Sequence, residues 1–138
     1  MKTHSTNYFN TFIQVADDCP AAVAQTPQAK KGQSTIAQMQ YQILENKPYQ
    51  FTSDDVLFDV YANKNNLNSE ALEQARKDFF SKGHPCFRTS PLAKRFGFGI
   101  HANSEGKIAI YAIETKEYEQ FLKNPEIKKV KAMRNSKK

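Results

Sequence analysis

The sequence predicts a single α+β domain, in which an antiparallel sheet made of a hairpin and an N-terminal strand is covered on one face by about four helices. Two observations lead to this fold class. The strand and helix patterns follow the order strand, three helices, hairpin, helix, with no internal repeat. The chain of 138 residues is long enough to bury one core, and its ten Phe and six Tyr supply large side chains for it.

Residues 8–16 (YFNTFIQVA) predict the N-terminal strand, because aromatic and β-branched side chains dominate them. Residues 17–33 contain two prolines and a glycine and predict a long loop. Two interpretations of this loop stay open, a lid over a site and a surface excursion without function.

The first predicted helix begins after Ser34 or Thr35, either of which can cap it, and ends before Pro48. Its apolar residues recur at helical spacing and form one stripe. These residues are Ile36, Met39, Ile43 and Leu44.

The second predicted helix begins in the run Thr52, Ser53, Asp54, Asp55, because hydroxyls cap helices and carboxylates favour the first turn. Asp54 and Asp55 therefore have two interpretations, as helix-start residues or as paired acids that do chemistry or bind a metal. The residues expected on the inner face are Val56, Leu57, Val60 and Tyr61.

A third helix is predicted to open at Asn68 and Ser69 and to close at Gly83, a residue type that often ends helices. Its apolar residues share one face, which should pack inward. They are Leu72, Ala75, Phe79 and Phe80.

Ser90 followed by Pro91 predicts a short helical turn, with the serine as cap and the proline in the first position. A short strand around residues 86–88 is a further expectation. Residues 96–101 and 107–113, joined by a turn that includes Gly106, predict the β-hairpin. In the FGFG string, the glycines leave one strand face bare, so that another backbone or a flat ligand can approach closely, and close packing of a helix over the glycines is the favoured interpretation.

Thr115 caps the last predicted helix, which ends near Asn124 and Pro125. The spacing of Ile127, Val130 and Met133 indicates a further amphipathic turn. We expect the domain to span residues 1–127 and a basic tail to span residues 128–138.

The net charge of +6 comes from this end of the chain. Seven of the 20 basic residues follow residue 122, whereas 13 of the 14 acidic residues precede it, so the body is neutral. A basic terminus can bind nucleic-acid phosphates, but it is more often a solvated end that aids solubility. Nucleic-acid binding is therefore a minor hypothesis.

The block from Gly83 to His101 holds the densest group of residues that shape backbone or do chemistry. It has the pattern G-x-P-C-x-R-x-S-P-L-x-K-R-x-G-x-G-x-H. This pattern, with the opening TNYFNTFIQVADDCP, the segment TSDDVLFDVYA and the ending IKKVKAMR, resembles a family of small, mainly bacterial, uncharacterised proteins known as a domain of unknown function. The resemblance covers nearly the whole chain and implies no activity.

The residues Arg88, Ser90, Lys94 and Arg95 predict a binding site for a small anion such as phosphate or the carboxylate of a metabolite. A helix start offers free N–H groups, and a hydroxyl and cationic side chains lie beside it. The alternative is that Ser90 only caps the helix and that the cations are solvated.

An enzyme is the second hypothesis, with Cys86 as nucleophile and His84 or His101 as its base. Cys86 can equally pack as a small hydrophobic residue, so the sequence does not decide whether the protein is an enzyme. Cys19, His84, Cys86 and His101 carry atoms that zinc prefers, but their spacing matches no zinc motif. We therefore expect no metal and no cofactor.

No apolar run reaches the roughly 18 to 20 residues of a membrane span, and the first residues lack a secretory hydrophobic region. We expect no membrane association and a cytoplasmic location. Cys19 and Cys86 are then expected to be free thiols.

Overall fold

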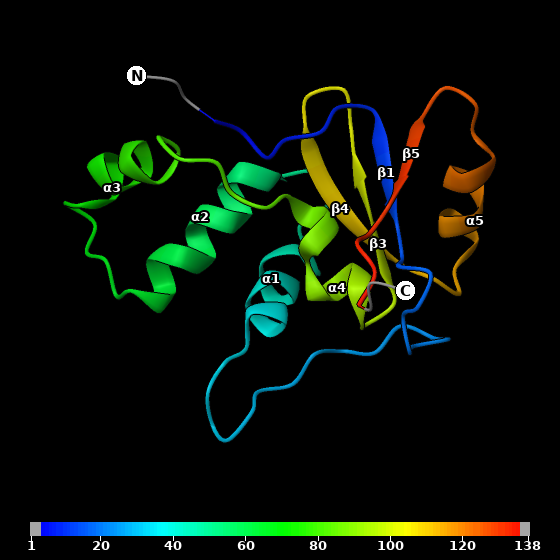
Figure 1. Ribbon diagram of the computed structural model, residues 1–138, viewed down its shortest axis with the longest axis horizontal. Helices are drawn as coiled ribbons and strands as arrows, with labels where there is room; N and C mark the ends of the chain where they lie inside the picture. The colour runs from blue at the N-terminus through cyan, green and yellow to red at the C-terminus, as the bar shows by residue number, and fades with distance from the viewer. Residues whose placement is uncertain (1–3, 136–138) are drawn as a thin grey trace.

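A five-stranded sheet forms the centre of the computed structural model, which describes residues 4–135 (Figure 1). Neighbouring strands are antiparallel, except for the last pair, which is parallel. The α+β class is confirmed, but the sheet is mixed rather than purely antiparallel. In spatial order the strands are β2 (Phe51–Thr52), β4 (Lys107–Ala112), β3 (Phe98–Ala102), β1 (Thr11–Gln14) and β5 (Lys128–Lys131).

Five α-helices lie within residues 4–135, where about four were expected. The longest has 12 residues, and none of those in this range is long and apolar enough to cross a membrane. A 3₁₀ helix, η1 (Phe87–Thr89), precedes the fourth. The α-helices are α1 (Ile36–Leu44), α2 (Ser53–Lys64), α3 (Leu72–Phe79), α4 (Pro91–Lys94) and α5 (Lys116–Lys123).

Side-chain caps begin four of these helices, as the sequence predicts. In each case a hydroxyl oxygen accepts a hydrogen bond from a backbone N–H of the first turn, which would otherwise lack a partner. At α2, the Asp55 carboxylate accepts a hydrogen bond from the backbone N–H of Thr52, which completes a capping box. The four caps are Thr35, Thr52, Ser90 and Thr115.

Helices pack on both faces of the sheet, so the expectation of a single covered face is wrong. On one face, Ile13 of β1 joins a core cluster with residues of α1, α2 and α4. On the other face, Phe12 packs against Tyr118 and Phe121 of α5. Successive strand residues point in opposite directions, and both directions are buried here.

Gly99 on β3 is what allows the α5 face to close. A Cβ at this position would lie 2.5 Å from Cζ of Phe12 and 2.6 Å from Cε2 of Tyr118, far inside van der Waals contact. The close approach predicted for the FGFG string is thus confirmed at Gly99, where the approaching groups are aromatic side chains.

Helix α3 lies outside the sheet and packs on α2 (Figure 1). Its expected inner face is confirmed, because Phe80 and its apolar neighbours cluster with Phe58 of α2. Both predicted ends of this helix are wrong. It begins at Leu72 after Ala71, which makes no side-chain cap bond, and not at Asn68 and Ser69. It ends at Phe79 and continues through Phe80 without a left-handed residue, so Gly83 is not its terminal glycine. On α2, Tyr61, which was expected on the inner face, is 41% exposed.

Two strand and helix expectations are also wrong. Residues 87–89 form the 3₁₀ helix η1 instead of a strand, closed by a bond from the N–H of Ser90 to the carbonyl of Phe87. Residues 128–131 form the edge strand β5 instead of an amphipathic turn, because they pair in parallel with β1. Lys137 and Lys138 of the expected tail lie outside the described residues.

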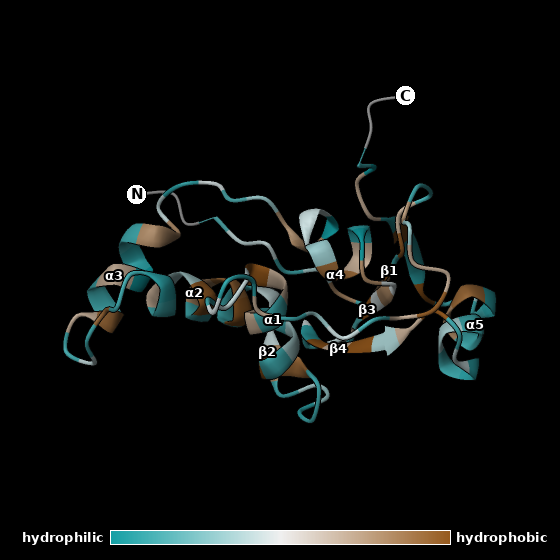
Figure 2. Cartoon of the chain, turned by 90° about the horizontal axis from the view of Figure 1, so that it is seen from below, coloured by the Kyte–Doolittle hydropathy of each residue, from teal (hydrophilic) through white to brown (hydrophobic). Residues whose placement is uncertain are grey.

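Hydrophobic residues concentrate where α1, α2 and the sheet meet, whereas α3 and α5 are largely hydrophilic on their outer sides (Figure 2). The loop expected at residues 17–33 has no helix or named strand, only an isolated bridge between Lys30 and Gln33. The loop is anchored to the body at Gln25, whose N–H donates to the carbonyl of Phe96.

Candidate functional site

The block from Gly83 to His101 is divided between two sides of the sheet. Its first part, through η1 and α4, runs along α1 and α2 and forms walls of two adjoining hollows. Its last part is β3, whose His101 belongs to the α5 face. The residues that the sequence places together are therefore not all neighbours in space.

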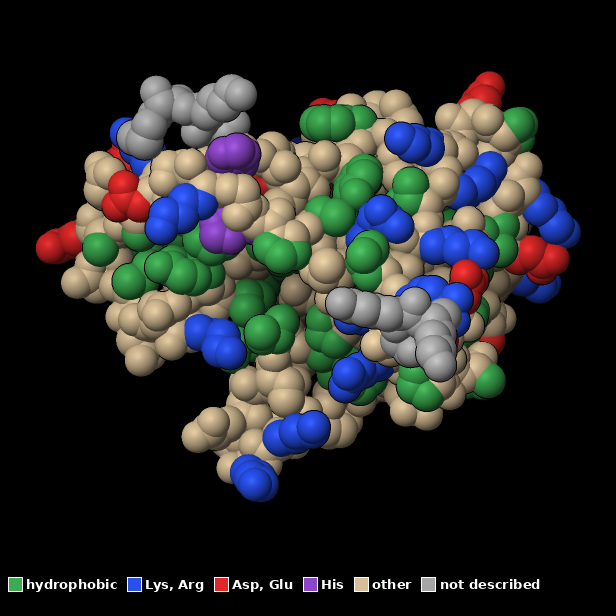
Figure 3. All heavy atoms as spheres, viewed as in Figure 1, with side chains coloured by type: hydrophobic (Ala, Val, Ile, Leu, Met, Phe, Trp, Pro, Cys, Tyr) green, Lys and Arg blue, Asp and Glu red, His purple; other side chains and the backbone are tan. Residues whose placement is uncertain are grey.

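The first hollow, which we call the apolar cleft, lies between α1, α2 and the segment 84–91 and has a volume of about 340 Å³. Figure 3 shows hydrophobic side chains in a hollow of this face, with basic side chains around its rim. Cys86 and His84 are among the lining residues. The apolar part of the lining consists of Ile36, Leu57, Val60, Tyr61, Phe79, Pro85 and Pro91.

His84 is held against Phe79 at the wall of the apolar cleft. The two rings are stacked with their centroids 3.7 Å apart, and Nε2 of His84 lies 2.5 Å from the carbonyl oxygen of Phe79. A carbonyl only accepts, so Nε2 carries a proton that it donates to this oxygen. The His84 ring is thus oriented by Phe79 at the end of α3, and not by the Cys86 thiol.

The thiol of Cys86 is paired with a tyrosine. Its Sγ lies 3.1 Å from the hydroxyl of Tyr8, and either atom can donate. Burial raises the pKa of Tyr8 to about 12, and the hydrogen bond with Cys86 adds to this, so the phenol stays protonated near neutral pH. A protonated phenol is not a base that could draw the proton from the thiol.

His101 lies on the other side of the sheet, in an aromatic cluster that the sequence did not indicate. Its Nδ1 is 2.8 Å from the hydroxyl of Tyr49, which is also 2.7 Å from the hydroxyl of Tyr111. Its ring stacks on Phe121 at 4.3 Å. Burial lowers the pKa of His101 and raises that of Tyr49, so both are neutral near pH 7.

Tyr49 has a left-handed backbone, with φ of 61°, which is unusual for a bulky residue. A hydrogen bond from its N–H to the carbonyl of Ile108 holds it there. The local sequence does not predict this left-handed conformation, because position 49 is neither Gly nor Asn. Tyr49 and His101 thus lie together on the α5 side of the sheet, whereas Cys86 lies at the apolar cleft.

Arg88 and Ser90 have structural partners. The Ser90 side chain is buried and donates to Oε1 of Gln40 at 2.6 Å, while it accepts from the N–H of Leu92. Nε of Arg88 donates to the carbonyl of Lys131 at 2.7 Å and so ties η1 to β5. Both residues fix the position of α4.

Lys94 and Arg95 line the second hollow, which we call the basic pocket and which has a volume of about 490 Å³. Lys30 from the 17–33 loop and Lys64 from the end of α2 join them there. No carboxylate is among the described residues that line it. The basic pocket adjoins the apolar cleft, and both are lined by Ile36, Lys64, Thr89 and Pro91.

Lys30 and Lys64 could not be assigned to this pocket from the sequence. Lys30 lies in a loop with no helix or named strand, and Lys64 ends α2, a position where a lysine is ordinary. Only the tertiary fold brings them to Lys94 and Arg95, which stand four and five residues after the Ser90 cap.

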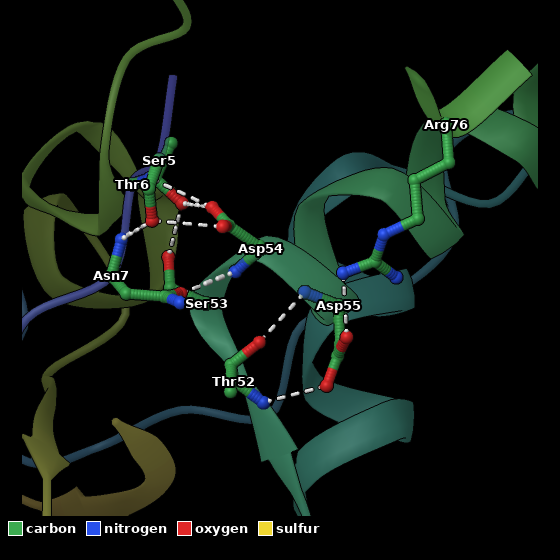
Figure 4. Close-up of polar contacts among 8 residues, drawn as sticks. All are labelled: Ser5, Thr6, Asn7, Thr52, Ser53, Asp54, Asp55 and Arg76. Atoms are coloured by element: carbon green, nitrogen blue, oxygen red, sulfur yellow. Dashed lines mark hydrogen bonds and ion pairs between the residues drawn. The ribbon is translucent and has the colours of Figure 1, made fainter. Parts of the chain in front are cut away.

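Asp54 and Asp55 have different partners and do not form an acid pair (Figure 4). The Asp54 carboxylate accepts bonds from Ser5 and Thr6 at 2.7–2.8 Å and fastens the N-terminal segment to α2. The Asp55 carboxylate contacts Arg76 of α3 at 2.9 Å. Burial opposes ionisation of Asp55, but the bonds from Thr52 and Arg76 outweigh it and lower its pKa.

Within residues 4–135, no group of three or more His, Cys, Asp or Glu is placed to hold a metal ion. Cys19 and Cys86 are free and half-buried. The sulfur of Cys19 faces the carbonyl of Ala21, and that of Cys86 faces Tyr8.

No curated protein and no solved structure matches the chain. A family model does match, and it covers residues 3–138. The chain belongs to this family, DUF6157, which is a family of unknown function.

Proposed function

We propose that the protein binds a small anionic ligand in the basic pocket, through Lys94 and Arg95 together with Lys30 and Lys64. The observation that carries the proposal is the gathering of four cationic side chains around one hollow without a lining carboxylate. Like charges that line one pocket repel one another, and an anion between them would remove that cost. Arg95, whose Nε donates to Asn135, adds a planar guanidinium whose other nitrogens suit carboxylate or phosphate.

The other lining residues and the volume of the pocket support the same conclusion. Gln28 also lines it, and the second hydrogen of its side-chain amide can donate to an anion, whereas the hydroxyls of Thr35 and Thr89 donate to backbone carbonyls. Its volume of about 490 Å³ falls within the usual range for small-molecule sites. In this proposal Arg88 and Ser90 act indirectly, because they hold α4, from which Lys94 and Arg95 project.

The other hypotheses from the sequence gain no observation in their favour. The Cys86 thiol is bonded to Tyr8 and not to a histidine. Lys128, Lys129 and Lys131 lie in β5, although they were expected in a free tail. A Cys86 nucleophile, nucleic-acid binding and a cytoplasmic location stay predictions.

The test is thermal unfolding with and without inorganic phosphate or citrate, at constant ionic strength set with NaCl. Binding to the folded state raises the melting temperature, and an anion at about 100 times its Kd adds about 2.7 kcal/mol of stability. We expect this rise in the native protein and its loss in the double variant Lys94→Gln/Arg95→Gln.

The matched control is Lys82→Gln/Lys116→Gln, which removes the same charge from two exposed lysines that line neither hollow. The control should keep the full rise. If neither anion raises the melting temperature of the native protein, or if both double variants respond alike, the proposal is wrong.

A further inference from the structure

We infer that the ligand is an amphipathic anion, with its charged group in the basic pocket and a hydrocarbon body in the apolar cleft. The simplest member of this class is a medium-chain carboxylate. The inference rests on the proposed anion site and goes beyond it by naming the second half of the ligand.

The two hollows adjoin. They share parts of α1, α2, η1 and α4 as common walls, at Ile36, Lys64, Thr89 and Pro91. A single molecule can therefore extend from one hollow into the other. Figure 3 shows the same arrangement from outside, with hydrophobic side chains in the hollow and basic ones on its rim.

The apolar cleft exposes hydrocarbon to water. Ile36 is 42% exposed and Tyr61 is 41% exposed, and both line the cleft. Apolar surface gathered in one concave place is unfavourable in water and usually marks a binding site.

Three polar side chains of the cleft already make hydrogen bonds within the protein. Nε2 of His84 donates to Phe79, the Ser90 hydroxyl donates to Gln40, and the Cys86 sulfur is bonded to Tyr8. A polar ligand body would find few free partners there and would lose its own hydration. A hydrocarbon body has no hydrogen bonds with water to lose.

The charge distribution identifies a small molecule with one charged end as the occupant. Among the described residues, four cationic side chains line the basic pocket, whereas the cleft is lined mainly by hydrocarbon and has one cation, Lys64, which the two hollows share. The volumes of about 340 and 490 Å³ both suit parts of a small molecule.

The experiment compares octanoate, octanol and acetate by isothermal titration calorimetry at one pH and ionic strength. Octanoate has the charge and the chain, octanol has only the chain, and acetate has only the charge. We expect octanoate to bind at least about tenfold more tightly than either of the others, because only octanoate both buries methylenes in the cleft and places a carboxylate among the cations.

The outcomes separate the two proposals. If acetate binds as tightly as octanoate, the anion site stands and the amphipathic inference is overturned. If octanol binds as tightly as octanoate, the cleft takes hydrocarbon but the anion proposal fails, and the inference fails with it. If none of the three binds, both are overturned.

Two variants divide the site in the same way. Tyr61→Gln changes a residue that lines only the apolar cleft, and it should weaken octanoate binding several-fold and leave the response to phosphate unchanged. The control Met133→Gln changes a residue of similar exposure, 46% against 41%, that lines neither hollow. Equal octanoate affinity in the two variants contradicts the inference.

Cys86 provides a readout inside the cleft. Octanoate should slow its alkylation by iodoacetamide several-fold and leave Cys19, which is half-buried elsewhere, unaffected. Phosphate should slow neither thiol. An unchanged rate at Cys86 under saturating octanoate would place the chain outside the cleft and overturn the inference.

Discussion

The two sides of the sheet differ in how completely their aromatic residues are enclosed. On the α5 side, Phe12 is fully buried, and its ring lies 4.9 Å from Tyr118 and 5.0 Å from Phe121. On the other side, beyond α4, the apolar cleft leaves Tyr61 41% exposed. The packing of the closed side indicates a structural role, whereas the open apolar side, which adjoins four cationic side chains, has room for a ligand.

The two histidines of the Gly83–His101 block show the consequence. His101 is enclosed by aromatic rings and bonded to Tyr49, so it stabilises the closed side. His84 lies at the wall of the open cleft. Both appeared equally suited to chemistry in the sequence, and the side of the sheet distinguishes them.

The largest expected effect tests how tightly the closed side is packed. Gly99→Ala should lower the free energy of unfolding by about 3 kcal/mol, because the new Cβ would lie 2.5 Å from the ring of Phe12 and the rings cannot easily move. Urea unfolding measures this. Gly83→Ala is the control, since its nearest new contact is at 3.8 Å, and equal losses in the two variants would contradict the comparison.

The next effect tests the hydrogen bonds of the closed side. Tyr49→Phe removes the hydroxyl that serves both His101 and Tyr111, and should cost about 1–2 kcal/mol of stability. Tyr61→Phe, in the exposed cleft, should change the free energy of unfolding by less than about 0.5 kcal/mol. Chemical denaturation of both variants decides, and a cost at Tyr61 as large as that at Tyr49 would remove the distinction.

The third effect concerns pH. Burial lowers the pKa of His101 in the folded state below the ordinary value of 6.5, so the unfolded chain takes up the proton first. Stability should therefore fall as pH drops below about 6.5, by at most about 1.4 kcal/mol per pH unit, until the folded histidine also titrates. His101→Gln should show a smaller loss between pH 7.5 and 5.5 in urea unfolding. Parallel losses in the two proteins would show that this histidine does not contribute.

The features that the sequence predicted correctly are those encoded within a few residues. Each cap, such as Thr52 with Asp55 three residues later, depends only on its own first turn. The hairpin turn likewise needs only Gly106, with φ of 82°, near its end.

Features that depend on distant partners were not predictable. Strand β5 has the charged sequence KKVK, and the three-residue spacing of Ile127, Val130 and Met133 imitates a helix. Its strand form comes from pairing with β1, more than a hundred residues earlier. An edge position explains its lysines, which discourage pairing with another chain.

The candidate site divides in the same way. Lys94 and Arg95 follow directly from the Ser90–Pro91 helix start, so half of the cationic set was predicted. Lys30 and Lys64 reach the pocket from a loop and from another helix. Arg88 and Ser90 were assigned to the ligand because their residue types suit anions, but tertiary contacts give them partners in the protein.

The smallest effect concerns the wall of the open side. Helix α3 carries Phe79 to the cleft, and the pair Asp55–Arg76 joins α3 to α2 at 2.9 Å. A double-mutant cycle with Asp55→Asn and Arg76→Gln should give a coupling of no more than about 1 kcal/mol, because both side chains are more than a third exposed. The pair Glu73–Lys77, at 3.9 Å and far more exposed, should give a coupling near zero.

The pH dependence of this coupling separates an ion pair from simple packing. Because the pKa of Asp55 is lowered in the folded state, its contribution is complete above the ordinary value of 3.8 and disappears as pH falls through the folded pKa. The coupling should therefore persist at pH 5 and weaken near pH 3. If the coupling stays constant into acid, it arises from packing of the two side chains and from a hydrogen bond to the neutral carboxyl, and not from the charge of Asp55.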